Sequence, residues 1–421
     1  MLNEKSLAAV SKAGFSKQFC KPLYSTYCFS RIPGTVQNLF GKKGKGLPKD
    51  TIIPDDYEVV VLFLIDGFGW RFFEKYVDKY PFLKRFIEKG IVSKITSQFP
   101  STTAAHVTSL NTGLDVGETG VFEWFYYEPM VDQIISPLMF CYGGDKEPGT
   151  LLQSKIPPKE FFPPGTIYQQ LKKENVNSFI IQHEGIAHSP YSNVLLKGGM
   201  QIPYFNFVHG INHAISICKE GKGQKYIHVY LGDIDAMGHR AGIDSPEFAK
   251  AVDECFKALE NVFFKEVSKL GKKIACLVTA DHGMVDVDPK TTFYINLQLK
   301  EILPMIKKNK KGNYIAPGGS CRDFFLYIEE DKLDLAEKLL KERLSSIAEV
   351  YKTTDLIDQN FFGKIISPAF LNRVGNLVIL PFEGEAVWWK ERHRYDQHFF
   401  GSHGGLTRNE METIFLFQSL A

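Results

Sequence analysis

Val59-Val60-Val61-Leu62-Phe63-Leu64-Ile65 is the stretch that decides the fold, and Asp66-Gly67 follows it at once. Seven consecutive apolar residues, four of them β-branched, predict a strand that is buried on both faces, as in a parallel sheet. The aspartate stands at the carboxyl end of that strand. Asp66 is therefore a candidate residue of a binding site.

Two further apolar stretches lead to acids in the same way. Residues 226–231 precede Asp233 and Asp235, and residues 273–279 precede Asp281. In open α/β sheets, ligands bind at the carboxyl ends of the parallel strands. The repeated pattern therefore predicts one site to which several strands contribute an acid.

Helix-like stretches lie between these strands, with apolar residues recurring three and four apart. They cover residues 72–88, 166–175, 212–220 and 246–269. The alternation of strand and helix predicts an α/β fold with a central, largely parallel sheet between helical layers. With 421 residues, the chain can form one large domain with an insertion, or two domains.

A different rhythm begins after Asp281. A strand-like stretch at 322–328, a helix-like stretch at 332–345 and a second strand at 350–351 predict a small βαβ unit inserted before His403. We expect residues 376–381 to return to the main sheet. The predicted organisation is thus a core of residues 1–285 and 376–421, with an inserted α+β cap at 286–375.

The charge composition argues against polyanionic partners. Lys and Arg number 50 and Asp and Glu number 48, for a net charge of +2. No global field favours nucleic acid or an anionic membrane, and the longest apolar run is too short to span a bilayer. We expect a small-molecule partner, and neither nucleic acid nor a membrane.

The seven cysteines are scattered and include no Cys-x-x-Cys pair. This disfavours both a disulfide framework and a thiolate zinc site. Residues 1–17 show no apolar segment followed by a small-residue cleavage site. We therefore expect a soluble, cytoplasmic protein with reduced thiols.

Three short motifs gather metal-ligating residue types. Asp235 and His239 stand four apart, so a helix would place both side chains on one face. Such a pair alone is more often an exposed helix pair than a metal site. Together with the acids and histidines of the other motifs, the pair forms a candidate site for two metal ions. The site has three carboxylates and three imidazoles, from Asp66, Asp235, His239, Asp281, His282 and His403.

The order of these motifs resembles the type I phosphodiesterase/nucleotide pyrophosphatase family of the alkaline phosphatase superfamily. The shared order is Asp-Gly, Pro-Ser-x-Thr, Asp-x-x-x-His, Asp-His-Gly and His-Gly-Gly, from about Val59 to the C-terminus. The resemblance implies an alkaline-phosphatase-like core. It also implies one metal ion held by Asp235, His239 and His403, and a second held by Asp66, Asp281 and His282.

The resemblance also implies a threonine nucleophile between the two ions. Ser101, Thr102 and Thr103 are consecutive, and family spacing from Pro100 and from Thr112-Gly113 selects Thr103. Coordination to the ions would lower the pKa of its hydroxyl. The alternative reading is an N-cap cluster that opens the helix at 104–110, and both readings are compatible. Mixed imidazole and carboxylate ligands favour two Zn²⁺ ions, with Mn²⁺ as the alternative.

One position departs from the family pattern. Where nucleotide pyrophosphatases carry an asparagine that binds a phosphate oxygen, Gly120-Val121-Phe122-Glu123-Trp124 places Trp124. Glu123, Trp124 and the aromatic residues up to Tyr127 are candidates for substrate contacts, or else form a buried aromatic cluster. Arg322 is expected in a surface salt bridge rather than at a phosphate, and His106 in helix packing.

We therefore predict a metal-dependent hydrolase of phosphodiester or nucleotide pyrophosphate bonds that works through a phosphothreonine. Within the superfamily, a phosphonate hydrolase and a phosphomonoesterase are the alternatives. A sulfatase is disfavoured because Cys20-Lys21-Pro22-Leu23-Tyr24 lacks the final arginine of Cys-x-Pro-x-Arg. From another class, a metal-stabilised binding module without turnover is the remaining alternative.

Overall fold

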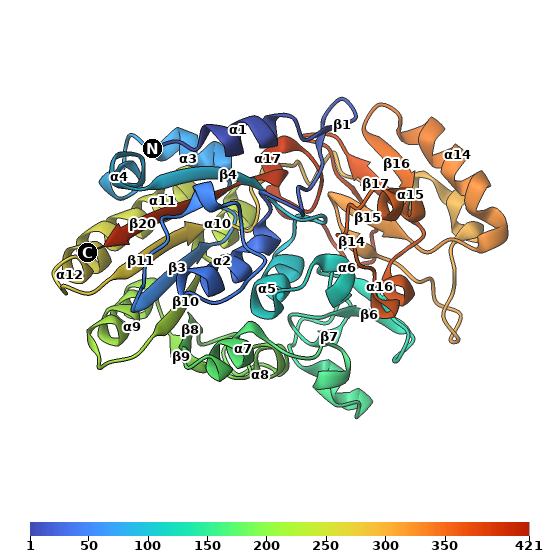
Figure 1. The fold of residues 1–421 in the computed structure, drawn as a ribbon. Helices are drawn as coiled ribbons and strands as arrows, with labels where there is room; N and C mark the ends of the chain where they lie inside the picture. Colours follow the sequence, from blue (N-terminus) through green and yellow to red (C-terminus); the bar gives the residue numbers. More distant parts are fainter. Residues whose placement is uncertain (421) are drawn as a thin grey trace.

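A seven-stranded sheet forms the centre of the computed structural model, which describes residues 1–420 (Figure 1). Only β20 runs antiparallel to its neighbours. The predicted α/β architecture with a largely parallel central sheet is confirmed. In spatial order the strands are β4 (Ile91–Thr96), β20 (Glu412–Leu420), β11 (Ile274–Thr279), β3 (Val59–Ile65), β10 (Lys225–Leu231), β8 (Asn177–His183) and β9 (Met200–Tyr204).

Strand β3 lies between β11 and β10 and is buried along its whole length. Its side chains alternate between two hydrophobic cores: Val59, Val61, Phe63 and Ile65 pack on one face, and the residues between them pack on the other. An unbroken apolar run is required because neither face meets water.

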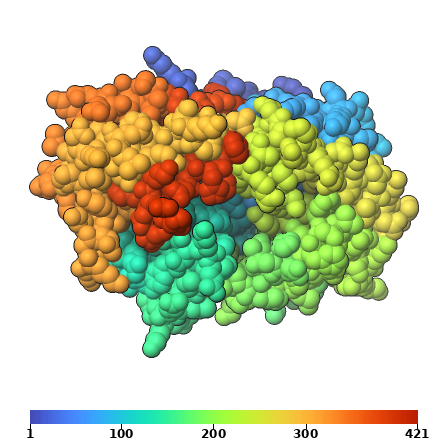
Figure 2. Space-filling model, turned by 180° about the vertical axis from the view of Figure 1, so that it is seen from behind, coloured from blue at the N-terminus to red at the C-terminus, as the bar shows by residue number. Residues whose placement is uncertain are grey.

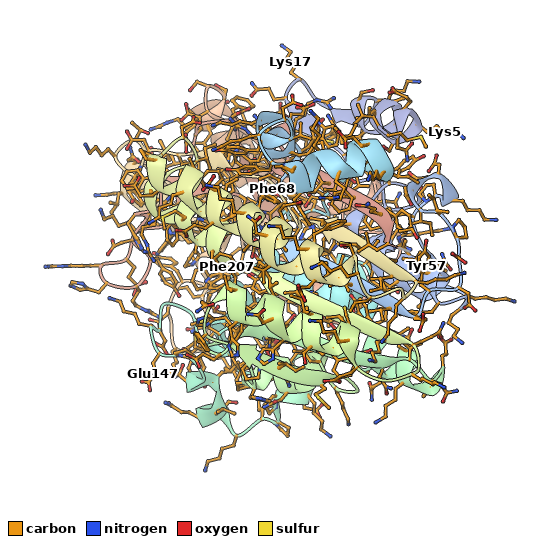
Figure 3. All side chains as sticks on the ribbon, turned by 90° about the vertical axis from the view of Figure 1, so that its left-hand side faces the viewer. Lys5, Lys17, Tyr57, Phe68, Glu147 and Phe207 are labelled. Carbon is orange, nitrogen blue, oxygen red and sulfur yellow. The ribbon has the colours of Figure 1, made fainter. Side chains whose placement is uncertain are left out.

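Helices cover both faces of the sheet (Figures 1 and 3). Figure 3 looks onto one layer, in which Phe68 packs against rings of α3 and α11. This layer contains α3 (Trp70–Tyr76), α4 (Pro81–Lys89), α9 (Phe207–Lys219) and α11 (Pro246–Ala258). The opposite layer contains α1 (Glu4–Ser11), α2 (Ile32–Leu39), α5 (Thr103–Thr112) and α7 (Ile167–Lys173).

The predicted helix at 72–88 is wrong in its continuity. It consists of α3 and α4, because Pro81 cannot continue a helix but suits the first turn of a new one. The predicted helix at 212–220 begins earlier, where the Asn206 side chain caps α9. The predicted helix at 246–269 continues from α11 through a π-helical turn at Leu259–Phe264 into α12 (Lys265–Val267).

A second, four-stranded sheet lies beside the first in Figure 1, in the order β14 (Gly318–Ser320), β15 (Asp323–Leu326), β17 (Leu377–Pro381) and β16 (Ala348–Lys352). Helix α14 (Leu333–Leu344) packs on β16. The expectation that 376–381 returns to the main sheet is wrong, because β17 pairs with β15 and β16 and separates the two strands of the expected βαβ unit. The division into a core and a cap at 286–375 stays a prediction.

Shorter elements complete the chain. Strand β12 (Val285–Asp286) pairs with β19 (Gly401–Ser402), which brings the segment after Asp281 next to His403. The remaining elements include β5 (Tyr126–Glu128), β6 (Gln133–Ser136), β7 (Cys141–Tyr142), β13 (Phe293–Tyr294), β18 (Val387–Trp388), α6 (Val116–Thr119), α8 (Pro190–Leu195), α10 (Asp233–Ala241), α13 (Ile295–Gln298), α15 (Thr353–Asp358), α16 (Pro368–Arg373) and α17 (Arg408–Met411). All seven cysteines are free and buried. Within residues 1–420, we find no helix with the length and hydrophobicity that crossing a membrane requires.

Candidate active site

Six carboxylate and imidazole side chains converge at the carboxyl edge of the main sheet. They form two groups of three, and within each group the candidate ligand atoms lie within 4.8 Å of one another. The groups are in contact, since the rings of His282 and His403 stack with centroids 3.6 Å apart. One group contains Asp235, His239 and His403, and the other contains Asp66, Asp281 and His282.

Helix α10 and the strand β19 build the first group. Asp235 and His239 lie one turn apart on α10, with Asp235 Oδ2 3.3 Å from His239 Nε2. His403 follows β19 and places its Nε2 3.2 Å from His239 Nε2 and 3.6 Å from Asp235 Oδ1. The helical spacing of Asp235 and His239 thus places both side chains at one point.

The second group stands on the neighbouring strands β3 and β11. Asp66 follows β3 directly, and Asp281 follows β11 after one residue. The Nε2 atom of His282 lies 3.4 Å from Asp66 Oδ1 and 3.4 Å from Asp281 Oδ2. Gly67 has a φ of +73°, and a Cβ there would lie 3.1 Å from Asp235 Oδ1. Glycine therefore allows the two groups to approach each other.

Backbone carbonyls fix the tautomers of the three imidazoles. The Nδ1 atoms of His239, His403 and His282 lie 2.8, 2.9 and 3.1 Å from the carbonyl oxygens of Gly401, Ser101 and Gly283. A carbonyl only accepts, so each Nδ1 carries a proton, and in the neutral ring each Nε2 presents a lone pair to its group. Metal-ligating histidines are typically held in this way.

Three carboxylate oxygens in the site are buried without a hydrogen-bond donor. They are Asp66 Oδ1, Asp235 Oδ1 and Asp281 Oδ2. An unpaired buried carboxylate oxygen is costly, and a cation next to it removes that cost. Together with the three inward lone pairs, these atoms form donor sets that fit two divalent cations.

The pKa shifts reflect the same shortage of positive charge. Burial and the charges of Asp281 and Asp235 hold the pKa of Asp66 well above its ordinary value, and burial with Asp235 raises the pKa of Asp281 to about 7. Burial also acts to raise the pKa of Asp235, but His239 and His403 outweigh it and lower the pKa. Burial lowers the pKa of His282 and of His403. Both rings are therefore neutral and can bind a metal ion.

Thr103 is the first residue of α5, and its hydroxyl reaches the second group. Its Oγ1 lies 3.3 Å from His282 Nε2 and 3.5 Å from Asp66 Oδ2. Ser101 instead donates to the carbonyl of Gly405 at 2.7 Å and accepts from the Gly404 N–H at 3.2 Å, which ties it to the His403 loop. Thr102 occupies the N-cap position, but its side chain does not cap the helix. The N-cap interpretation thus does not explain the hydroxyl of Thr103.

A cavity of 350 Å³ opens over the first group. Glu123, Trp124 and Phe125 line it from one side, and the segment 394–399 lines it from the other. Figure 2 shows this face of the molecule hollowed between the red segment near residue 400 and the green segments below it. Of the aromatic run 124–127, Trp124 and Phe125 line the cavity, whereas Tyr126 is buried beside Phe122 in the core.

Glu123 forms a buried acid pair beside this cavity. Its carboxyl group lies beside that of Asp323, which accepts from the N–H of Ser320 at 3.1 Å. Glu123 Oε1 and Asp323 Oδ2 both lack a donor. Burial raises the pKa of Glu123 to about 7, and burial together with Glu123 holds the pKa of Asp323 well above its usual range.

Arg322 differs from expectation: it is fully buried and not at the surface. It forms a two-point contact with Glu410, at 3.0 Å from Nε to Oε1 and 2.9 Å from Nη2 to Oε2. Glu410 also accepts from the N–H of Gly405 at 3.0 Å. The ion pair of Arg322 and Glu410 therefore connects the loop that carries His403 to the four-stranded sheet. His106 packs as expected, because its ring bonds the carbonyl of Thr102 and the N–H of Gln98.

Tyr230 is a site residue that our sequence interpretation did not include. Its hydroxyl donates to Asp66 Oδ2 at 2.5 Å. The sequence does contain a pattern that indicates this residue. In 226–231, polar side chains stand at alternate positions, so Tyr226, His228 and Tyr230 share one face of β10.

A profile of the family described as type I phosphodiesterase/nucleotide pyrophosphatase matches residues 60–406. Among curated protein sequences, none matches significantly. The murine ectonucleotide pyrophosphatase/phosphodiesterase 5 structure is similar with a TM-score of 0.65 at 18% identity, covering 85% of this chain and 87% of that one.

Two further structures share the fold. One is the same murine protein as an inactive threonine-to-alanine variant in complex with AMP, with a TM-score of 0.65, 18% identity and coverage of 86% and 88%. The other is phosphonoacetate hydrolase from Sinorhizobium meliloti 1021 in complex with phosphonoacetate. It has a TM-score of 0.60 and 17% identity, and the match covers 87% of this chain and 92% of that one.

Proposed function

The chain belongs to the type I phosphodiesterase/nucleotide pyrophosphatase family, and we propose that it hydrolyses phosphodiester or nucleotide pyrophosphate bonds with Thr103 as nucleophile. The family typically depends on divalent metal ions. The observation that carries the proposal is the position of the Thr103 hydroxyl, in reach of His282 and Asp66 and lining the same cavity as Asp235, His239 and His403.

Two ions would be held by the two groups of three side chains, and we expect Zn²⁺, with Mn²⁺ as the alternative. Bound there, they would supply positive charge that lowers the pKa of the nucleophile and offsets charge at phosphorus. The murine relative that is inactive as a threonine-to-alanine variant supports the same assignment of a threonine.

Residues of this chain have separate roles in the proposed reaction. Thr103 Oγ1 attacks phosphorus and forms a phosphothreonine while the first ester group leaves; water then cleaves the phosphothreonine and restores the hydroxyl. As the first residue of α5, Thr103 stands at a helix N-terminus, whose free N–H groups favour phosphoryl oxygens. Tyr230 holds Asp66 in place through its hydroxyl.

A diester fits this site better than a monoester. A monoester carries two negative charges and needs an additional cation near the nucleophile, but Arg322 is committed to Glu410. Two cavities border Thr103, one of 350 Å³ and one of 260 Å³, so each of two ester groups has room. A small phosphonate, as in the complex of the bacterial neighbour, would leave both cavities largely unfilled.

The test compares three substrates with added Zn²⁺ or Mn²⁺: bis-p-nitrophenyl phosphate, thymidine 5′-p-nitrophenyl phosphate and p-nitrophenyl phosphate. We expect higher kcat/KM for the two diesters. Trp124→Ala should lower turnover of the nucleotide ester more than that of the simple diester, because stacking on an aromatic side chain contributes about 1–3 kcal/mol. A preference for the monoester would contradict the substrate class and leave the metal assignment standing.

A further inference from the structure

A second cavity, of 260 Å³, begins at the candidate nucleophile and extends along the main sheet. Thr103, Trp124 and Asp235 line both this cavity and the larger one. The two cavities therefore meet at the position where phosphorus would sit. Under the proposed function, on which this inference rests, each cavity would receive one of the two ester groups.

The walls of the second cavity combine aliphatic and aromatic side chains. Trp124, which it shares with the larger cavity, is exposed, whereas Tyr191 and Tyr230 bond through their hydroxyls to Thr108 and Asp66. A nucleobase is held best between aromatic faces, whereas an alkyl chain is held by aliphatic side chains. The aliphatic side chains of the wall are Val107, Leu138, Met139, Ile180, Ile186 and Leu196.

His228 adds a buried polar atom to this apolar wall. It lies on β10, two residues before Tyr230 and on the same face, and thus about 7 Å farther from the carboxyl edge of the sheet. The ring is only 3% exposed, and its Nε2 has no hydrogen-bond partner. Burial lowers the pKa of His228 to about 4, which keeps the ring neutral.

A buried polar network sets which nitrogen of His228 carries the proton. It starts at the carbonyl of Ala104, which can only accept: Thr108 Oγ1 donates to it at 2.7 Å. Because that hydroxyl proton is used, Tyr191 must donate to Thr108 Oγ1, at 2.9 Å. The side-chain amide of Asn111 lies next to the hydroxyl of Tyr191.

The second half of the network leads from Asn111 to the cavity. The amide oxygen of Asn111 accepts from Tyr168 Oη at 2.7 Å. The Tyr168 oxygen must then accept from Nδ1 of His228, at 3.1 Å. Nδ1 is therefore the protonated nitrogen, and Nε2 is a buried acceptor without a partner, on a ring that lines the cavity.

We infer that this cavity binds one ester group of the substrate as a hydroxylated aliphatic alcohol whose hydroxyl donates to Nε2 of His228. An ammonium group fits less well, because the carboxylates that line the cavity, Asp66 and Asp235, are both in the metal groups at the other end. A buried ammonium without a carboxylate partner is costly, whereas a hydroxyl needs only the one acceptor.

Matched substrates test the subsite: p-nitrophenyl 4-hydroxybutyl phosphate against p-nitrophenyl n-butyl phosphate. We expect the wild type to prefer the hydroxylated ester by about ten- to a hundredfold in kcat/KM, since an unpaired buried acceptor costs about 1–3 kcal/mol. His228→Leu should remove this ratio, and His228→Gln, which retains an acceptor, should restore part of it. The ratio within one variant is independent of that variant's overall activity.

Two companion variants separate a specific role from a general loss. Tyr168→Phe should reduce the same ratio, because His228 then loses the acceptor that holds its proton on Nδ1. His183→Leu, on the neighbouring strand β8 and outside the cavity lining, should leave the ratio unchanged. If the ratio of kcat/KM for the hydroxybutyl ester to that for the butyl ester is the same in the wild type and in His228→Leu, the inference is overturned. It is also overturned if the enzyme prefers the thymidine ester to the hydroxybutyl ester and His228→Leu does not alter that preference.

Binding measurements keep this inference distinct from the proposed function. With Thr103→Ala, calorimetry should show tighter binding of 4-hydroxybutyl phosphate than of n-butyl phosphate, and His228→Leu in that background should abolish the difference. If no diester is hydrolysed but this difference is found, the proposed function fails and the subsite stands. If diesters are hydrolysed and the difference is absent, the subsite fails alone.

Discussion

The Nε2 atoms of His239 and His403 lie 3.2 Å apart, and in the neutral rings both present lone pairs, because each Nδ1 donates to a backbone carbonyl. Two lone pairs at this distance repel each other unless a cation lies between them. The unpaired Oδ1 of Asp235 is 3.6 Å from His403 Nε2 and completes a three-ligand set.

From this geometry we expect the purified protein to carry about two transition-metal ions per chain. His403→Ala should reduce the content to about one, because the group of Asp66, Asp281 and His282 keeps its ligands. Elemental analysis after dialysis measures this. His188→Ala, in an exposed turn, is the matched control, and equal loss of both ions in His403→Ala would contradict the division into two groups.

Thr103→Ala should lower kcat by about 10³-fold or more without unfolding the chain, since it removes the attacking oxygen. Thr103→Ser should retain part of the activity. Mass spectrometry of acid-quenched enzyme should find phosphate on Thr103 in the wild type and on no residue in the alanine variant. A fully active Thr103→Ala enzyme with an inactive Thr102→Ala counterpart would show that the nucleophile lies one residue earlier.

Ser101 is expected to behave differently from its neighbours. Its hydroxyl joins the N–H of Gly404 to the carbonyl of Gly405, so Ser101→Ala should loosen the His403 loop. The expected result is weaker metal retention with kcat largely recovered at saturating Zn²⁺. A loss of kcat that added metal does not restore would instead place Ser101 in the chemistry.

Arg322→Met should destabilise the chain by about 3–5 kcal/mol, because it leaves Glu410 as a buried, unpaired charge. Urea unfolding measures the change in free energy of unfolding. The double variant Arg322→Met with Glu410→Leu should recover part of the loss. As a control, Lys75→Ala removes an exposed ion pair with Asp244 and should cost at most about 1 kcal/mol.

The sequence was sufficient for three neighbouring strands of the main sheet, β11, β3 and β10, because each is a mostly apolar stretch that leads to an acid. The motifs around Asp66, Asp235, Asp281 and His403 could be found for the same reason: their residue types and spacing are local properties. The position of β17 could not be predicted, since an apolar strand of five residues fits either sheet, and pairing with β15 and β16 is decided by distant segments.

The tautomers of the histidine rings could not be predicted from the sequence either. Which nitrogen of His228 carries the proton depends on its contact with Tyr168, whose hydroxyl donates to Asn111. The burial of Arg322 likewise depends on its contact with Glu410, which lies 88 positions away in the sequence. Such properties arise from long-range contacts, and no local pattern encodes them.

The last prediction concerns the buried pair Glu123 and Asp323. The pKa of Glu123 is raised by burial from 4.5 to about 7. Between these two pH values, the folded chain holds a proton that the unfolded chain has released. The contribution of Glu123 to the free energy of unfolding should therefore fall as the pH rises through this window, and its loss should be complete above about pH 7.

Glu123→Gln removes this proton and supplies an N–H donor for the unpaired Oδ2 of Asp323. We expect the variant to be more stable than the wild type at pH 8, by on the order of 3 kcal/mol, and the difference to vanish near pH 4. Urea unfolding at both pH values, in chelator so that metal release contributes to neither protein, measures it. Glu147→Gln, at an exposed position labelled in Figure 3, controls for the loss of any glutamate. A difference that is the same at both pH values, or larger at pH 4, would show that Glu123 and Asp323 do not share a proton in the folded chain.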